Sequence, residues 1–236
     1  MLPTSQSEMS AEWKWYDFLF VILTSLFLTA AAAAVLPMEL GDQEGIITTS
    51  WIQYLTWAAL ALALAQMRTI RRHGMGLVFA LKDIWYIPFG FGLQLALSLL
   101  ALPLIQLLRP NAEPLQEAVS TMGNLQDPLL IVAFASMVTV AAPIVEELTF
   151  RGILMGSARR LGIWWSIIIS AVVFSLFHII GLSDRGAALI ALPQILILGG
   201  ILGWMTWKAD RLGPAIATHA GFNLLAVVLT LTGLDY

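Results

Sequence analysis

Seven long apolar runs constrain this chain more than any other feature of its sequence. They extend over Phe18–Leu36, Ile47–Met67, Ile84–Leu108, Leu129–Ser157, Ile163–Ile180, Ala187–Trp207 and Pro214–Thr232. An apolar run of about 20 residues can cross the hydrocarbon core of a bilayer as a helix. Charged residues make up only 11% of the chain, against about 25% in a soluble domain. We therefore predict an all-α fold, a polytopic transmembrane helical bundle of seven spans.

Lysine and arginine in the loops indicate the orientation of the bundle. One side collects nine of them: Lys14, Arg68, Arg71, Arg72, Lys82, Arg159, Arg160, Lys208 and Arg211. The other side has Arg109 and Arg185. Because basic loops stay in the cytoplasm, we expect an integral protein of a bacterial-type inner membrane with a cytoplasmic N-terminus. The first run exceeds the about 7–15 apolar residues of a signal peptide, so we expect an uncleaved span.

Composition also excludes some kinds of chemistry. The chain contains no cysteine, which removes disulfides, thiol catalysis and Cys-ligated metals. Its net charge of −3 does not indicate a nucleic-acid partner. The polar segment Asn111–Asp127 is expected to hold at most a short interfacial helix. Gly199 and Gly203 form a GxxxG pattern, which predicts close packing of helix backbones.

Three charged residues stand alone within the fourth apolar run: Glu146, Glu147 and Arg151. Each charge at a membrane centre costs roughly 2.5–3.5 kcal/mol, so such groups indicate a functional site. Glu147 and Arg151 are i,i+4 neighbours and can neutralise each other. Glu146 is turned by about 100° from Glu147, so it must be neutral, paired with a histidine or in a wet cavity. Pro143, one turn earlier, should free the carbonyl of Thr139 and open room for water.

Other polar groups lie in two further apolar runs. His178 is in the fifth run, with Phe174 one turn before it, and His219 is in the seventh. Asn223 follows His219 at i+4, so the two share a helix face. His73 lies in a basic loop and is interpreted as a bystander. A single membrane histidine can serve only to hold helices together, but this set, spread over three apolar helices, predicts a functional site.

Three motifs carry a resemblance to a known family: Glu146-Glu147-x-x-x-Arg151, Phe174-x-x-x-His178 and His219-x-x-x-Asn223. They resemble the motifs of the CPBP family of membrane proteases. That family includes the type II CAAX prenyl endopeptidases and bacterial proteins once grouped as abortive-infection or bacteriocin-processing proteins. The resemblance covers about Leu129–Thr232. It implies a CPBP-like catalytic membrane core in 129–236, preceded by membrane spans of unassigned role in 1–128. Well-known relatives have eight spans, so eight are possible here.

The resemblance implies an intramembrane endopeptidase. In the family pattern, Glu146 is the general base that activates a water against the peptide carbonyl, and His178 helps to position that water. At about 1.5 Å per residue, Glu146 lies about 20 Å from Arg159, His178 about 24 Å from Gly162 and His219 about 12 Å from Arg211. Helix tilt, or a fourth helix that extends past the membrane, would close this spread of about 12 Å. We therefore expect a cavity that opens to the cytoplasm. The expected partners are a peptide or membrane-protein substrate, prenylated or not, and the lipid bilayer.

The remaining site residues are implied to support the reaction. His219 and Asn223 would form the oxyanion hole, and Glu147 with Arg151 would hold the site together. No cofactor is expected, with zinc as the alternative, because two histidines and a carboxylate suit a catalytic zinc. The chain has no HExxH sequence, and Asn223 is not a usual zinc ligand. Two further alternatives are a non-catalytic immunity protein and a transport protein, although no repeated half typical of transporters is visible.

Overall fold

The computed structural model describes residues 13–35, 43–68, 72–108 and 117–233. Seven helical segments in this part of the chain are long and apolar enough to cross a membrane: Trp15–Val35, Gln43–Met67, Leu81–Leu108, Pro128–Leu161, Ile163–Gly181, Arg185–Ala209 and Gly213–Thr232. The predicted all-α bundle with seven spans is confirmed. The predicted ends of the spans differ from these by four residues at most.

The helical elements follow one another along the chain with short connections. The first half contains α1 (Trp15–Val35), α2 (Gln43–Met67), α3 (Arg72–Met75), η1 (Leu81–Trp85), α4 (Tyr86–Leu108) and α5 (Glu117–Gly123). The fourth span is the succession α6 (Pro128–Ser136), η2 (Met137–Ala141), α7 (Ala142–Glu147), η3 (Leu148–Leu154), α8 (Met155–Ala158) and η4 (Arg159–Leu161). The last spans are α9 (Ile163–Phe177) with η5 (His178–Gly181), α10 (Arg185–Ala209) and α11 (Gly213–Thr232).

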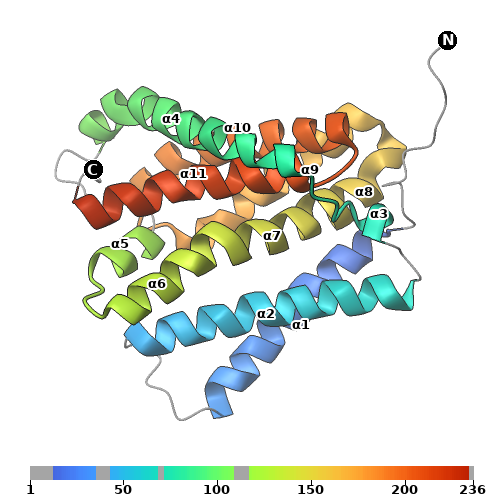
Figure 1. The fold of residues 1–236 in the computed structure, drawn as a ribbon, viewed down its shortest axis with the longest axis horizontal. Coiled ribbons are helices and arrows are strands. Elements are labelled where there is room, and N and C mark those ends of the chain that lie inside the picture. The colour runs from blue at the N-terminus through green and yellow to red at the C-terminus, as the bar shows by residue number, and fades with distance from the viewer. Residues whose placement is uncertain (1–12, 36–42, 69–71, 109–116, 234–236) are drawn as a thin grey trace.

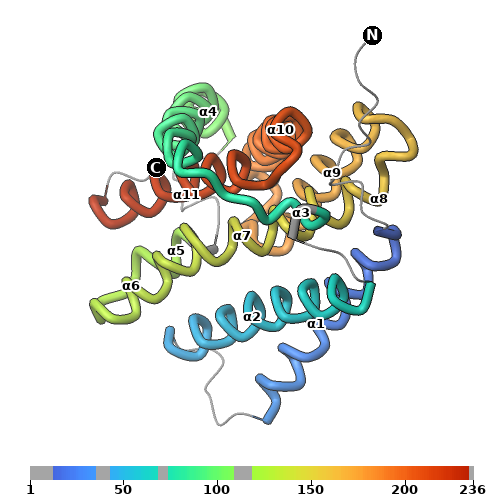
Figure 2. The backbone as a smooth tube through the Cα atoms, turned by 45° about the vertical axis from the view of Figure 1, so that its right-hand side comes forward, coloured from blue at the N-terminus to red at the C-terminus, as the bar shows by residue number. Residues whose placement is uncertain are grey.

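The fourth span lies in the middle of the bundle. Figure 2 shows the pair α1 and α2 on one side of it and α4, α10 and α11 on the other. At one end of the bundle lie α5 and the start of α6, and at the other lie α3 and α8 (Figure 1). The short helix α5 agrees with the interfacial helix expected within Asn111–Asp127. Residues 111–116 of that segment lie outside the described residues, and so do Arg71 and Arg109. The central span can therefore contact helices from both halves of the chain.

Glycines set the distance between α4 and α11. A Cβ atom on Gly90 would lie 1.9 Å from the carbonyl oxygen of Thr218, and one on Gly221 would lie 2.0 Å from that of Ile87. No side chain fits at either position, so the two backbones touch. This contact fixes the position of α11, which carries two of the predicted site residues.

The predicted GxxxG packing is also found. A Cβ atom on Gly199 of α10 would lie 3.1 Å from the Cα atom of Ala171 in α9. One on Gly203 would lie 3.2 Å from a side-chain carbon of Ile167. The two glycines therefore bring α10 against α9, as expected from small residues one turn apart.

The fourth span departs from regular α-helix at η2 and η3, which are π-helical. The N–H of Ala142 donates to the carbonyl of Met137, five residues back, and the N–H of Met155 donates in the same way to Phe150. Segments of this kind occur frequently at functional sites. Here they enclose α7, which carries the two glutamates, and they change which carbonyls in this span lack a helical partner.

Candidate active site

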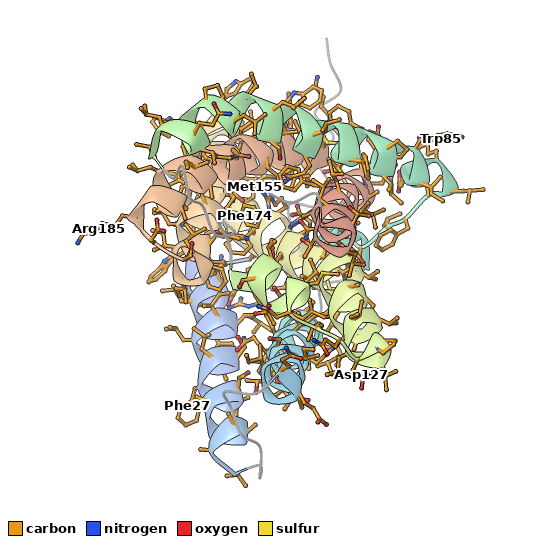
Figure 3. The ribbon with its side chains drawn as sticks, turned by 90° about the vertical axis from the view of Figure 1, so that its left-hand side faces the viewer. Phe27, Trp85, Asp127, Met155, Phe174 and Arg185 are labelled. Carbon is orange, nitrogen blue, oxygen red and sulfur yellow. The ribbon has the colours of Figure 1, made fainter. Side chains whose placement is uncertain are left out.

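Four of the predicted site residues line one cavity of about 730 Å³: Glu146, His178, His219 and Asn223. Most of the other lining residues are apolar, and they come from both halves of the chain. The remaining two, Glu147 and Arg151, are fully buried beside the cavity, each 0% exposed. Figure 3 shows Phe174, which also lines the cavity, near the middle of the bundle, while Phe27 and Trp85 lie at its periphery.

Glu146 lies at the cavity wall with its two oxygens in different surroundings. Its Oε1 accepts a hydrogen bond of 2.9 Å from the hydroxyl of Tyr54 in α2. Its Oε2 lies 3.8 Å from Nε2 of His219, beyond hydrogen-bond distance. The helical rotation between Glu146 and Glu147 thus separates their partners, as the spacing predicted. Tyr54 was not foreseen, because nothing local in the second apolar run relates it to the fourth.

Glu147 and Arg151 form the predicted pair. Nη1 of Arg151 donates to Oε1 of Glu147 at 2.8 Å, and its Nη2 donates to the carbonyl of Gly199 at 3.2 Å. The guanidinium carbon lies 4.3 Å from the centre of the Phe174 ring, a cation–π arrangement. The charge of Arg151 is therefore compensated by a carboxylate, a carbonyl and an aromatic face.

His219 contacts the same carboxylate. Its Nδ1 lies 2.9 Å from Oε1 of Glu147, and an ionised carboxylate can only accept, so Nδ1 carries the proton. In a neutral His219, Nε2 is then an acceptor, and it becomes a donor only when the ring carries both protons. This contact was not predicted, because Glu147 and His219 are 72 residues apart on different helices.

His178 begins η5, directly after α9. Its Nδ1 lies 2.8 Å from the carbonyl of Phe174, so that nitrogen donates and Nε2 is left as an acceptor. The His178 ring stands edge-on to Phe174 at 4.6 Å, and the ring of His219 does the same at 5.7 Å. Phe174 thus separates the two histidines and contacts both, which agrees with its predicted place on the face of His178.

Asn223 is anchored to the π-helical segment. Its Nδ2 donates to the carbonyl of Val138 at 2.9 Å. Because the N–H of Ala142 bonds to Met137, the next donor in the π register for Val138 would be Pro143, which has no N–H. We expected Pro143 to free the carbonyl of Thr139. The carbonyl of Val138, one residue earlier, accepts from Asn223, whose amide keeps one further N–H.

The comparison with protein families decides what this arrangement resembles. The family model described as type II CAAX prenyl endopeptidase Rce1-like matches residues 128–225. Residues 128–225 are Rce1-like. The Rce1-like segment contains all six predicted site residues, and the match agrees with the resemblance to the CPBP family. It supports an intramembrane protease of the CAAX type, which is a peptidase and a hydrolase. Comparison with curated proteins and with solved structures gives no match.

The cavity extends from the Rce1-like motifs toward one end of the bundle. Its lining includes residues near the end of α1, the start of α2, in α5 and at the end of η5: Ala33, Ile46, Val119 and Gly181. Basic residues gather at the opposite end of the bundle: Lys14 just before α1, Arg68 just after α2 and Arg159 in η4. A cytoplasmic N-terminus and a cavity open to the cytoplasm were both expected. The lining at the end away from these basic residues favours a cavity that opens on the opposite side, and the orientation of the bundle stays a prediction.

A catalytic zinc would need three protein ligands and an open position. In both histidines of the Rce1-like segment, Nδ1 is hydrogen-bonded within the protein. Within the described ranges, no three His, Cys, Asp or Glu side chains lie so that they could hold a metal ion.

Proposed function

We propose that the chain is an intramembrane endopeptidase in which Glu146 activates a water. The supporting observation is that Glu146 lines the cavity while its Oε1 is held by Tyr54 and its Oε2 has no hydrogen bond to His219, 3.8 Å away. Oε2 takes a proton from the water while the water oxygen attacks the peptide carbonyl carbon. The protonated Glu146 then delivers this proton to the leaving amine nitrogen as the C–N bond breaks. The acceptor nitrogen of His178 would orient the attacking water.

Stabilisation of the oxyanion, the negatively charged oxygen that forms from the peptide carbonyl, is assigned to His219 and Asn223. Asn223 offers the amide N–H that is not used by Val138. His219 can donate from Nε2 only as an imidazolium, because Nδ1 already faces Glu147. Glu146, Glu147 and Arg151 together carry a formal charge of −1, and a protonated His219 brings that sum to zero.

Glu147 therefore has two tasks in this proposal. It pairs with Arg151 and it fixes the orientation of His219, as a buried carboxylate does for the histidine of a serine-protease triad. A single oxygen, Oε1, accepts from both partners. Loss of this carboxylate would release the ring and leave the guanidinium without its counter-charge.

The proposed substrate is a peptide or membrane protein with an apolar or prenylated group beside the cleaved bond. A cavity of about 730 Å³ lined largely by apolar side chains suits such a group, because its burial removes apolar surface from water or lipid headgroups. We further propose that the basic end of the bundle is cytoplasmic and that the cavity faces the other side of the membrane.

The test is a comparison of membrane-protein termini in cells that produce the wild-type chain and cells that produce Glu146→Ala. The proposal predicts that cleavage creates new termini in some membrane proteins. These termini should be found in cells with the wild-type chain and be absent from cells with the variant. A peptide spanning such a site, with and without its lipid group, then serves as the substrate for kinetics. If the two cell lines have the same termini, the chain is not an active protease and the immunity or transport alternatives are favoured.

A further inference from the structure

We propose that Tyr54 is a positioning residue for Glu146, so that the active site extends to α2, outside the Rce1-like segment. This inference rests on the proposed function. Tyr54 lies 92 residues before Glu146 in the chain, and its hydroxyl is 2.9 Å from Oε1. Both side chains line the same cavity. The pair thus joins the N-terminal spans, which had no assigned role, to the reacting carboxylate.

The ring of Tyr54 is held in place by its neighbours. It stacks on Trp57, with ring centres 5.9 Å apart and planes 12° from parallel. Trp57 is only 2% exposed, and its ring meets those of Phe150 and Phe177 at 6.3 and 5.6 Å. A buried aromatic cluster that includes the fourth and fifth spans therefore fixes where the hydroxyl points.

The hydroxyl determines which oxygen of Glu146 can react. A phenol at neutral pH is a donor to an ionised carboxylate, which offers only acceptors. With Oε1 occupied, rotation of the carboxylate is restricted, and Oε2 stays directed toward His219 at 3.8 Å. Within the described residues, the hydroxyl of Tyr54 is the hydrogen-bond donor to Glu146. Without it, the carboxylate could turn toward other donors, and the water would lose its oriented base.

A purely structural role for Tyr54 makes different predictions. In that case the hydroxyl only satisfies a buried polar group, and its loss would lower the stability of the fold. In the positioning role, its loss slows the chemical step while the fold and substrate binding remain. The two are separated by measuring kcat, KM and thermal unfolding on the same purified variant.

The experiment uses Tyr54→Phe, which keeps the ring on Trp57 and removes the hydroxyl. Tyr86→Phe is the matched control, because it makes the same change at an exposed position at the start of α4. With the peptide identified from the cell comparison as substrate, Tyr54→Phe should lower kcat about 10- to 100-fold, the effect of a lost hydrogen bond to a charged group. KM should change less than about twofold, and Tyr86→Phe should match wild type.

A double variant gives the second readout. If Tyr54 acts through Glu146, adding Tyr54→Phe to Glu146→Gln should cause no further loss of the residual rate, because contacting residues are not additive. Independent structural damage would multiply the two losses and would overturn the inference.

A well-folded Tyr54→Phe with the wild-type kcat would overturn the inference as well. A loss of kcat that is explained by a lowered unfolding temperature would also overturn it. Neither result would contradict the proposed function as long as Glu146→Gln remains inactive. The proposed function fails separately if Glu146→Gln cleaves the peptide normally.

Discussion

At the scale of single residues, the site is a chain of contacts centred on two adjacent glutamates. Glu146 is held by Tyr54, and Glu147 is held by Arg151 and His219. Their partners differ because successive residues on a helix face directions about 100° apart. One glutamate is thus directed to the cavity and the other to the interior. These different surroundings of the two glutamates underlie the predictions for substitutions at single residues.

Arg151→Ala should destabilise the fold. It leaves the fully buried Glu147 without its counter-charge, and breaking a buried pair costs roughly 3–5 kcal/mol. Thermal unfolding in detergent should show a lowered midpoint together with reduced activity. If the variant unfolds at the wild-type temperature and activity vanishes, Arg151 acts directly on the substrate.

Asn223→Ala should lower kcat about 10²–10³-fold, the usual effect of losing one oxyanion donor, with little change in KM. A smaller loss of stability should accompany it, because the carbonyl of Val138 loses its partner. Kinetics and unfolding measured on one preparation separate the two effects. A large rise in KM at unchanged kcat would instead make Asn223 a substrate-binding residue.

At the scale of elements, the position of α11 relative to α4 depends on glycine. Two backbones in contact leave no space for a methyl group at Gly90 or Gly221. By contrast, a Cβ atom on Gly92 of α4 meets nothing within 4 Å. The same helix therefore offers a position that should accept a side chain and one that should not.

Gly90→Ala should lower the unfolding temperature and the activity together, because it pushes α11 and its two site residues away. Gly92→Ala is the matched control and should leave both unchanged, since alanine is the better helix former where space allows. The comparison is made by thermal unfolding of the two purified variants. Equal stability of both would show that the close contact between α4 and α11 is not required.

The sequence predicted those parts of the structure that depend on neighbours along the chain. Apolar run length located the seven spans, and i,i+4 spacing located the pair of Glu147 and Arg151. Contacts between helices could not be derived in this way, since Tyr54 and Glu146 are 92 residues apart. The π-helical register was also missed, because it changes only backbone hydrogen bonds. It leaves the carbonyl of Val138 to the side chain of Asn223.

At the scale of the whole molecule, the two ends of the bundle differ. Basic residues gather at one end, and the cavity extends toward the other. The chain contains no cysteine, so single cysteines can report which end faces which side of the membrane. Val119 lines the cavity, and Arg160 is exposed at the basic end. The two positions lie at opposite ends of the bundle, and Val119 is half-buried whereas Arg160 is exposed.

In intact cells, a membrane-impermeant thiol reagent should label Val119→Cys. Arg160→Cys should react only after the membrane is permeabilised, because basic loops remain in the cytoplasm. The reverse pattern would place the cavity on the cytoplasmic side and the N-terminus outside. That result would contradict the orientation inferred from the loop charges.

The central claim is that Glu146 is the general base of a membrane peptidase, and its most direct test is the rate of peptide cleavage by purified Glu146→Gln. The variant keeps the shape and a hydrogen-bond acceptor for Tyr54, but it loses the basic oxygen. The matched control is Glu44→Gln, the same change at an exposed position in α2. We predict a normally folded Glu146→Gln with nearly all cleavage lost and a Glu44→Gln that cleaves at the wild-type rate. Near-normal cleavage by Glu146→Gln would contradict the account.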